Sequence, residues 1–190
     1  FRSDVVTDGI VRFTTNGLEL RSGRHLDADI VVTATGLELQ MFGGMQLRVD
    51  GAPYDVSKKM IYKGVLLQDL PNFAWILGYV NLSWTMKADM SSLYLCRLFK
   101  HMKQHNQAVV IPRDHDNAAL EESVLDALSA GYIERAKHLL PRQGRDAPWC
   151  VHHNYEEDHQ MMMQTPIEDA RLEMGSPKSP RQSKVTRHAA

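Results

Sequence analysis

One stretch constrains the fold more than any other: a short apolar run at residues 73–77, a glycine, and a long amphipathic segment at residues 85–105. The apolar run follows a Pro-Asn pair and predicts a buried strand that Gly78 ends. In the longer segment, apolar residues recur every three or four positions, which predicts one helix with an apolar stripe. The members of this stripe are Met86, Met90, Leu93, Cys96, Phe99 and Met102. A strand that turns sharply into a long helix is typical of α/β proteins.

The start of this helix is also the first candidate for a binding site. Ser83 or Thr85 can serve as the N-cap, and Asp89 follows in the first turn or just after it. The first backbone N–H groups of a helix have no partner within the helix and lie at the positive end of its dipole. They can therefore bind an anion or an electron-rich carbonyl group. An ordinary strand-to-helix connection that binds nothing is the alternative that the residues leave open.

The first 36 residues predict β structure. Residues 10–15 alternate, an Asn16-Gly17 pair typical of type I′ turns follows, and residues 18–20 make a return strand, so we expect an antiparallel meander. Residues 30–34 are an apolar run that predicts a buried strand. The small residues that follow it, up to Gly36, would let the backbone approach a bulky group or a neighbouring helix closely.

Signals in the remainder of the chain are weaker. We expect a hairpin across residues 45–56, short strands at residues 62–67 and 109–111, and a helix at residues 117–128. Residues 132–140 are compatible with a helix that ends before Pro141, and the chain after this proline looks irregular. Residues 175–190 carry four basic residues, two prolines and no acidic residue, which predicts a disordered basic tail.

Composition limits the classes of function. The chain is 43% hydrophobic and 24% charged, with a formal net charge of −1, as in ordinary soluble globular proteins. This charge predicts no general attraction to nucleic acid or anionic membranes, and no apolar run has the length of a transmembrane segment. Cys96 and Cys150 are expected to be reduced thiols without a catalytic role, so a cytoplasmic location fits.

Histidines give two further candidates for a metal site. His101 and His105 are four residues apart on the predicted helix, which places both imidazoles on one side, but no glutamate follows His101 as it does in zinc hydrolases. His152, His153 and His159 lie near a run of three methionines, a combination that copper could bind. The first pattern is explained by exposed histidines that interact with the dipole at the helix C-terminus, and the second by a chance cluster in a surface extension. We therefore expect no metal site.

Three motifs in a fixed order resemble one enzyme family. Residues 78–89 read Gly-Tyr-Val-Asn-Leu-Ser-Trp-Thr-Met-Lys-Ala-Asp, residues 34–36 read Ala-Thr-Gly, and downstream lie Gly131-Tyr132, Pro141-Arg142-Gln143-Gly144, Pro148-Trp149 and Asn154-Tyr155. Together they resemble the flavin-containing monooxygenases over residues 4–170. The nearest branch is the Baeyer–Villiger type, which includes the mycobacterial monooxygenase that activates thioamide prodrugs. Many relatives have a proline directly before the Gly-Tyr pair, where this chain has Ala130.

The resemblance implies the C-terminal part of an α/β flavoprotein with two dinucleotide-binding domains: a β-meander, buried strands, a long amphipathic helix and an irregular extension. The expected parts are the end of the NADPH-binding domain with its return strand (residues 1–36), the rest of the FAD-binding domain (37–112), a helical and irregular extension (113–174) and the basic tail (175–190). The Gly-x-Gly-x-x-Gly fingerprints of FAD and NADPH binding are absent from the chain, which opens at Phe1. We therefore expect a missing N-terminal FAD- and NADPH-binding part of the same protein, and a fragment that is inactive alone and holds no catalytic residue.

The implied reaction uses FAD, NADPH and O₂ to insert one oxygen atom into a ketone or a sulfur compound, via a C4a-peroxyflavin. The alternatives are a monooxygenase that oxidises nitrogen or sulfur without ketone activity, and a non-catalytic remnant that acts as an interaction module. In either enzyme the substrate would be a small molecule. The residues expected to contact FAD are Thr35, Gly36, Asn81, Ser83, Thr85 and Met86. Trp84 would border the substrate or the nicotinamide, or else pack in the core.

Overall fold

The computed structural model describes residues 3–126, 128 and 130–176, and the chain divides into two compact units. The first unit is Phe1–Leu37 and the second is Glu38–Ala190. The boundary falls after Leu37, and the expected division of the chain into domains stays a prediction. The assignment of either unit to a nucleotide-binding domain stays a prediction.

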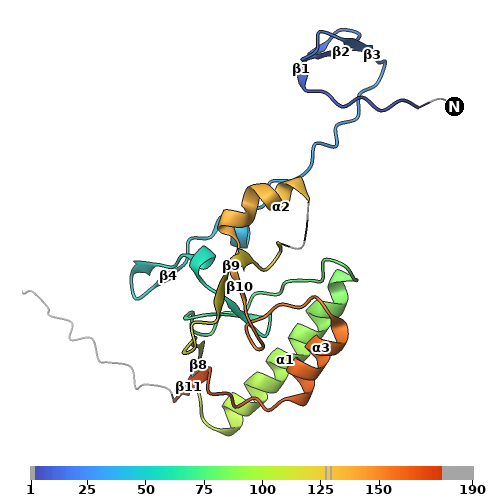
Figure 1. Cartoon of the computed structure of the whole chain (residues 1–190). Helices are drawn as coiled ribbons and strands as arrows, with labels where there is room; N and C mark the ends of the chain where they lie inside the picture. Colours follow the sequence, from blue (N-terminus) through green and yellow to red (C-terminus); the bar gives the residue numbers. More distant parts are fainter. Residues whose placement is uncertain (1–2, 127, 129, 177–190) are drawn as a thin grey trace, which may run out of the picture. The chain divides into compact units, whose positions relative to one another are not determined.

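The first unit contains the predicted β-meander (Figure 1). Its strands are β1 (Ile10–Thr14), β2 (Gly17–Leu20) and β3 (His25–Asp27), paired antiparallel in the order β1-β2-β3. The turn lies one residue earlier than expected, because Thr14 pairs with Gly17 and the glycine is already part of β2. A Cβ at Gly17 would lie 1.9 Å from the carbonyl oxygen of Leu26. The close approach of β3 therefore explains this glycine, and the predicted type I′ turn is wrong.

The predicted buried strand at residues 30–34 is also wrong. Ile30 and Val32 are each 83% exposed, and no strand of the described residues pairs with this segment. A fully apolar strand is stable only where neighbours satisfy its backbone groups and cover both faces. The first unit supplies neither, so the apolar run lies extended and exposed.

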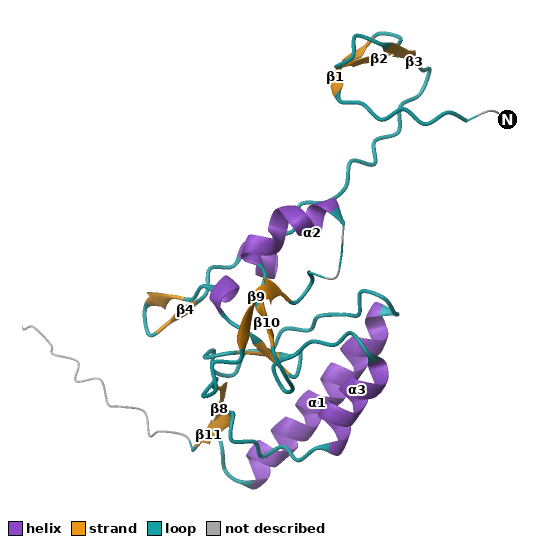
Figure 2. Cartoon of the chain, in the orientation of Figure 1, coloured by secondary structure: helices purple, strands orange, loops and turns teal. Residues whose placement is uncertain are grey.

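The second unit is a mixed α/β structure of small antiparallel sheets and helices (Figure 2). Its described residues form four two-stranded sheets. Two are short hairpins: β4 (Arg48–Val49) with β5 (Ala52–Pro53), and β6 (Ile61–Tyr62) with β7 (Leu66–Leu67). The other two pair β8 (Val109–Pro112) with β11 (Leu172–Gly175), and β9 (Ala119–Ser123) with β10 (Arg142–Gly144). Its α-helices are α1 (Trp84–Gln104), α2 (Gly131–Ala136) and α3 (Tyr155–His159). Short 3₁₀ helices lie at Met41–Gly44, Val56–Lys58 and Lys137–Leu139, and a π-helical turn, η4 (Gln160–Gln164), continues α3. None of the described helices combines the length and the apolar character that crossing a membrane requires.

Several predicted elements are present, and others are not. The hairpin of β4 and β5, strand β8 and the helical stretch before Pro141 are confirmed. The predicted short strand at residues 62–67 is a hairpin of β6 and β7 around Lys63 and Gly64, both with positive φ. The helix predicted at residues 117–128 is wrong, since strand β9 pairs there with β10 and long-range pairing overrides the local pattern. Gly175, expected in the tail, ends β11, and residues 177–190 of the predicted tail lie outside the described residues.

The apolar run at residues 73–77 forms less structure than expected. It is extended, with one isolated bridge between Ala74 and Leu66 and one hydrogen bond from the Trp75 N–H to the Val65 carbonyl oxygen (2.7 Å). Phe73, Trp75 and the residues after them are only half-buried, and Gly78 is buried. The expected buried strand is therefore an extended segment beside the β6–β7 hairpin.

Helix α1 is confirmed within one residue at either end, but its buried face differs from the predicted stripe. The buried residues are Lys87, Met90, Ser91, Tyr94, Leu98 and Met102. Of the predicted stripe only Met90 and Met102 are buried, whereas Cys96 is exposed, Leu93 is 48% exposed and Phe99 is 60% exposed. The buried face is turned towards α3 and η4, which lie beside α1 (Figure 1).

Two apolar clusters form the core of the second unit. The first joins α1 to the β6–β7 hairpin and the C-terminal segments; its fully buried members include Tyr62, Tyr94, Leu98, Trp149 and Met162. The second includes Ile61, Leu67, Ile133, Leu140 and Val151. Strands β6 and β7 contribute to both clusters, so this hairpin packs the middle and the C-terminal half of α1 against the rest of the unit.

Candidate functional site

The connection into α1 has a buried base and an exposed rim. Gly78 and Tyr79 are buried, whereas residues 81–86 are all exposed. This rim contains Asn81, Ser83, Thr85 and Met86, the residues of this segment that we expect to contact a cofactor. The structure thus brings the four together on one exposed loop and helix start, and their contact with FAD stays a prediction.

Trp84 shapes the loop by packing on Gly78. A Cβ at position 78 would lie 2.1 Å from two carbon atoms of the indole ring, so only glycine fits beneath it. The side chain of Trp84 is nevertheless 54% exposed. Its ring therefore packs on the loop and keeps exposed surface, and its position beside a substrate or the nicotinamide stays a prediction.

The helix start offers two free backbone donors. Ser83 occupies the N-cap position, but its side chain caps no backbone N–H; its Oγ instead shares a hydrogen bond of 2.8 Å with Thr85 Oγ1. The Ser83 carbonyl oxygen accepts from the Met86 N–H at 3.1 Å. Within the described part of the chain, the N–H groups of Trp84 and Thr85 have no hydrogen-bond partner. The first turn also contains no carboxylate, so Asp89 does not offset the positive end of the 21-residue helix.

A buried ion pair anchors this rim from beneath. Lys87 Nζ lies 2.6 Å from Asp158 Oδ2, and the two side chains are 3% and 0% exposed. The same ammonium lies 5.4 Å from the ring centre of Tyr79. Lys87 belongs to the start of α1 and Asp158 to α3, so one contact ties the loop, the helix start and the C-terminal helix together. A buried charge needs such a partner, because its transfer from water is otherwise strongly unfavourable.

Burial perturbs the titration of this group of residues. It lowers the pKa of Lys87, and the opposing attraction of Asp158 offsets part of the effect. It also raises the pKa of Tyr79, and the neighbouring Asp158 carboxylate raises it further. The neighbouring His153 is buried, and burial lowers the pKa of its imidazole as well.

A second buried lysine lies on the turn between β6 and β7. Lys63 Nζ donates hydrogen bonds to the Met161 carbonyl oxygen (3.2 Å) and to Thr165 Oγ1 (2.8 Å). Burial lowers its pKa to about 8. The next residue, Gly64, has a φ of +68°, and a Cβ there would lie 3.3 Å from Lys87 Nζ. Sequence reasoning missed this lysine, because a lysine beside a turn glycine is ordinarily exposed.

Thr35 and Gly36, the other two residues expected near FAD, belong to the first unit. Both are exposed. Gly36 has a φ of +89°, and a Cβ there would have no neighbour within 4 Å. Backbone conformation, rather than crowding, therefore explains this glycine, and the backbone has open space beside it.

The histidines near the methionine run do not converge. His153 is buried and its Nε2 lies 3.2 Å from the Val124 carbonyl oxygen, while His159 stacks on the ring of Tyr155. Met162 is fully buried in the first core cluster. The imidazole of His152 has a different neighbour, described next, so these residues form no shared binding site.

Neither cysteine is arranged as a nucleophile. Cys96 is exposed, in contrast to its predicted place on the buried face. The Cys150 sulfur lies 3.7 Å from His152 Nδ1, but that same nitrogen lies 3.1 Å from Glu157 Oε2. Burial raises the pKa of the Cys150 thiol, and nearby carboxylates raise it further. A reactive thiolate requires the opposite shift.

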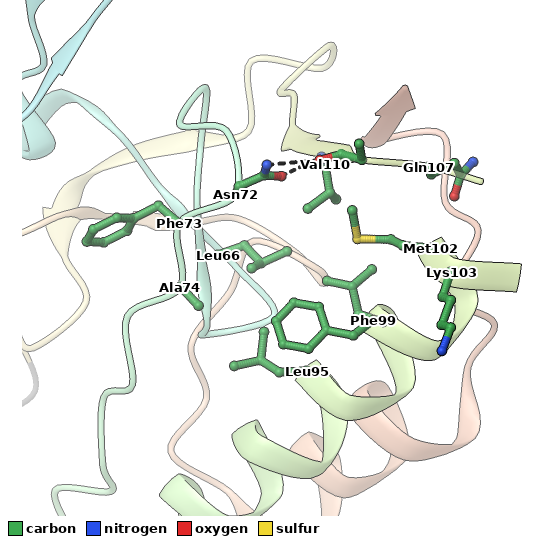
Figure 3. Close-up of a pocket in the computed structure, with 12 residues that line it drawn as sticks. Leu66, Asn72, Phe73, Ala74, Leu95, Phe99, Met102, Lys103, Gln107 and Val110 are labelled. Atoms are coloured by element: carbon green, nitrogen blue, oxygen red, sulfur yellow. Dashed lines mark hydrogen bonds between the residues drawn. The ribbon is translucent and has the colours of Figure 1, made fainter. Parts of the chain in front are cut away.

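A mainly apolar hollow of about 400 Å³ lies along the other end of α1 (Figure 3). Its lining includes Leu66, Leu95, Phe99, Met102 and, at one side, Lys103. Asn72 borders it and exchanges hydrogen bonds with the backbone of Val110 and Ala108. At a rise of 1.5 Å per residue, Phe99 is about 20 Å along the axis from Met86. The hollow is therefore separate from the predicted cofactor rim.

Comparison with known proteins identifies several relatives. The chain is 49% identical over 170 residues to the protein of Mycobacterium tuberculosis named FAD-containing monooxygenase MymA. It is 45% identical over 171 residues to the FAD-binding monooxygenase AlmA of Acinetobacter baylyi, and 41% identical over 178 residues to the FAD-containing monooxygenase EthA of M. tuberculosis. These alignments cover 90%, 90% and 93% of this chain but only 34%, 34% and 36% of the three relatives. No family profile and no solved structure matches the chain.

The predicted resemblance is confirmed: over nine-tenths of its length the chain is homologous to flavin-containing monooxygenases. Within that class it resembles EthA as well as MymA and AlmA. The chain spans about a third of the length of these curated relatives.

Proposed function

We propose that this chain is the flavin-side, C-terminal portion of an FAD- and NADPH-dependent monooxygenase that acts in the cytoplasm. The observation that carries the proposal is its identity of 41–49% to proteins named FAD-containing or FAD-binding monooxygenases, over at least 90% of its own length. The reaction would insert one oxygen atom from O₂ into a small molecule. By the Baeyer–Villiger resemblance, the acceptor would be a ketone or a sulfur compound.

The rim at the start of α1 would face one edge of the flavin ring. The free N–H groups of Trp84 and Thr85 are donors, and the carbonyl oxygens of an isoalloxazine are acceptors. FAD, when bound, supplies the electron transfer and the activation of oxygen. The helix dipole and the two N–H groups would stabilise negative charge at the ring edge that faces them. Asn81, Ser83, Thr85 and Met86 would line the ring. The contact of Thr35 and Gly36 with the cofactor is implied by the family resemblance alone and stays a prediction.

The buried contacts explain why such a rim would stay in place. Hydrogen-bond donors stabilise a developing charge best when they are already fixed before reaction. Lys87 and Asp158 hold the helix start to α3, and the indole of Trp84 holds the loop at Gly78. Trp84 would then present its exposed surface to the substrate or the nicotinamide.

The proposal is tested on the complete protein that contains this chain. We expect it to purify with one FAD per protein and to oxidise NADPH in a reaction that consumes O₂. Ser83→Trp would place a bulky ring on the rim and should abolish FAD binding, measured by flavin absorbance after gel filtration. The matched control is Ser92→Trp, at an exposed position about two and a half turns further along α1. Normal FAD content in Ser83→Trp would show that the rim does not face the cofactor.

A further inference from the structure

The C-terminal end of α1 gathers three side chains that can bind a metal ion. His101 and His105 lie on consecutive turns of the helix end, and Glu168 comes from the segment between η4 and β11. One ligand atom from each lies within 4.8 Å of the other two. From the sequence we expect no metal at these two histidines, because the carboxylate that joins them, Glu168, lies 63 positions after His105.

The three groups lie close enough to share one ligand after a small movement of a side chain. The two imidazole rings stack with centroids 4.1 Å apart and an interplanar angle of 27°. His101 Nε2 lies 3.6 Å from Glu168 Oε1, longer than a normal hydrogen bond. The side chain of His101 is only 13% exposed and that of Glu168 is 72% exposed. One ligand is therefore held by its surroundings, and another is free to move towards it.

A backbone hydrogen bond fixes the tautomer of the second histidine. His105 Nδ1 lies 2.9 Å from the carbonyl oxygen of His101. A carbonyl oxygen only accepts, so Nδ1 must carry the hydrogen and donate it. In the neutral ring this leaves a lone pair on Nε2. Histidines that bind metals ordinarily donate their other N–H to a carbonyl or carboxylate in this way.

We propose that His101, His105 and Glu168 bind a divalent transition-metal ion, with Zn²⁺ as the ion that best suits two imidazoles and one carboxylate. Tetrahedral Zn²⁺ with bonds of about 2.0–2.1 Å holds its ligand atoms about 3.4 Å apart, so the three groups need to draw together by roughly 1 Å. Rotation of the exposed Glu168 side chain supplies this movement, while His105 keeps its hydrogen bond to the His101 carbonyl oxygen. A water molecule takes the fourth position.

The ion would fasten the C-terminal segment to α1. Glu168 precedes Asp169, whose carboxylate accepts a hydrogen bond from the Tyr62 hydroxyl (3.1 Å) and another from the Arg171 backbone N–H (2.8 Å). Of these two bonds only the one from Tyr62 links the segment to a distant part of the chain, and a metal bridge from the helix end to Glu168 would add a second link beside it. A ligand that binds only the folded chain stabilises it in proportion to the logarithm of its free concentration.

The experiment uses the whole 190-residue chain, freed of metal by chelation and titrated with Zn²⁺ alone. We expect one equivalent to bind by calorimetry at micromolar concentrations and to raise Tm. His105→Gln and Glu168→Gln should each weaken binding at least about tenfold, since even outer partners of metal ligands contribute that much. His115→Gln, an exposed histidine outside the group, is the matched control and should bind as the parent does.

Two results would overturn the proposal. The first is absence of saturable Zn²⁺ binding while the chain is folded by circular dichroism. The second is unchanged affinity in Glu168→Gln, which would reduce the site to an ordinary pair of helical histidines. Co²⁺ gives an independent readout: the visible absorption of a four-coordinate ion should appear with the parent chain and be lost in Glu168→Gln.

Discussion

Removal of the Lys87 ammonium should strongly destabilise the second unit. Lys87→Met keeps the length and the apolar stem of the side chain but leaves the Asp158 carboxylate buried without a cation. Within the described residues, Asp158 has no other ion-pair partner, and its side chain is 0% exposed. Breaking one side of a buried pair typically lowers the free energy of unfolding by about 3–5 kcal/mol. Since whole domains have about 5–15 kcal/mol, the effect should be large enough to measure directly.

Removal of both charges should be less harmful than removal of one. In Lys87→Met with Asp158→Leu, the site becomes apolar and of similar volume, and no buried charge is left without a partner. Replacing a buried pair by well-packed apolar residues is often neutral or stabilising. We therefore expect the double variant to be more stable than either single variant, with a coupling free energy of about 2 kcal/mol or more.

Urea unfolding of the four proteins, followed by circular dichroism, gives this coupling as a double-mutant cycle. Lys100→Met is the matched control, because Lys100 is an exposed lysine of the same helix and should change stability by no more than about 0.5 kcal/mol. Two results would refute this reasoning: a decrease in the free energy of unfolding of less than about 1 kcal/mol in Lys87→Met, or simple additivity in the double variant. Either would show that the pair is not shielded from water as the structure indicates.

Other predictions follow from single positions. The pKa of Lys63 is lowered to about 8, so between this pH and the ordinary lysine pKa the unfolded chain binds more protons than the folded chain. The free energy of unfolding should therefore rise with pH in this window, by at most about 2 kcal/mol. Urea unfolding from pH 8 to 10 should show the rise, and Lys63→Met should reduce it. At higher pH stability should fall again, because burial raises the pKa values of Tyr62 and Tyr94 and the unfolded chain then loses their protons first. Gly78→Ala should displace the indole of Trp84 and destabilise the chain by about 1–3 kcal/mol, with a change in tryptophan fluorescence. Adding Trp84→Ala should restore part of that loss, and no recovery would argue against the ring contact.

The sequence predicted the existence of α1 but not which of its faces is buried. A period of 3.6 residues in the apolar pattern indicates a helix whichever of its faces is buried, so the bounds of α1 could be predicted from local residues alone. Its buried face includes Lys87 and Ser91, which no hydrophobic pattern selects. Lys87 is buried because Asp158 meets it there, and that partner lies 71 residues further along the chain.

The apolar runs show a related limit. Residues 30–34 and 73–77 have the composition of buried strands, yet the first is unpaired and the second has a single bridge among the described residues. A strand depends on partners for its backbone hydrogen bonds, whereas a helix satisfies its own. The candidate rim was easier to predict, because a glycine, an N-cap residue and a long helix are all local features. The proposed metal site could not be found in the same way, since Glu168 reaches it only in the folded chain.

Buried polar contacts explain how α1 settles on one packing face. Its apolar residues extend around more than one side, and exposed Leu93 and Phe99 are as hydrophobic as the buried Leu98. Hydrophobic burial alone would therefore allow more than one rotation of the helix about its axis. Among the described residues Lys87 forms its ion pair with Asp158 alone, and the Arg97 guanidinium donates to the Met162 and Thr165 carbonyl oxygens. Both contacts form in one rotation of the helix. Our hypothesis is that the ion pair selects the packing as well as stabilising it. The apolar double variant at positions 87 and 158 should then unfold at a urea concentration similar to that of the parent. It should, however, bind the dye ANS and lose near-ultraviolet circular dichroism. A parent-like spectrum without dye binding would show that apolar packing alone fixes the rotation of the helix.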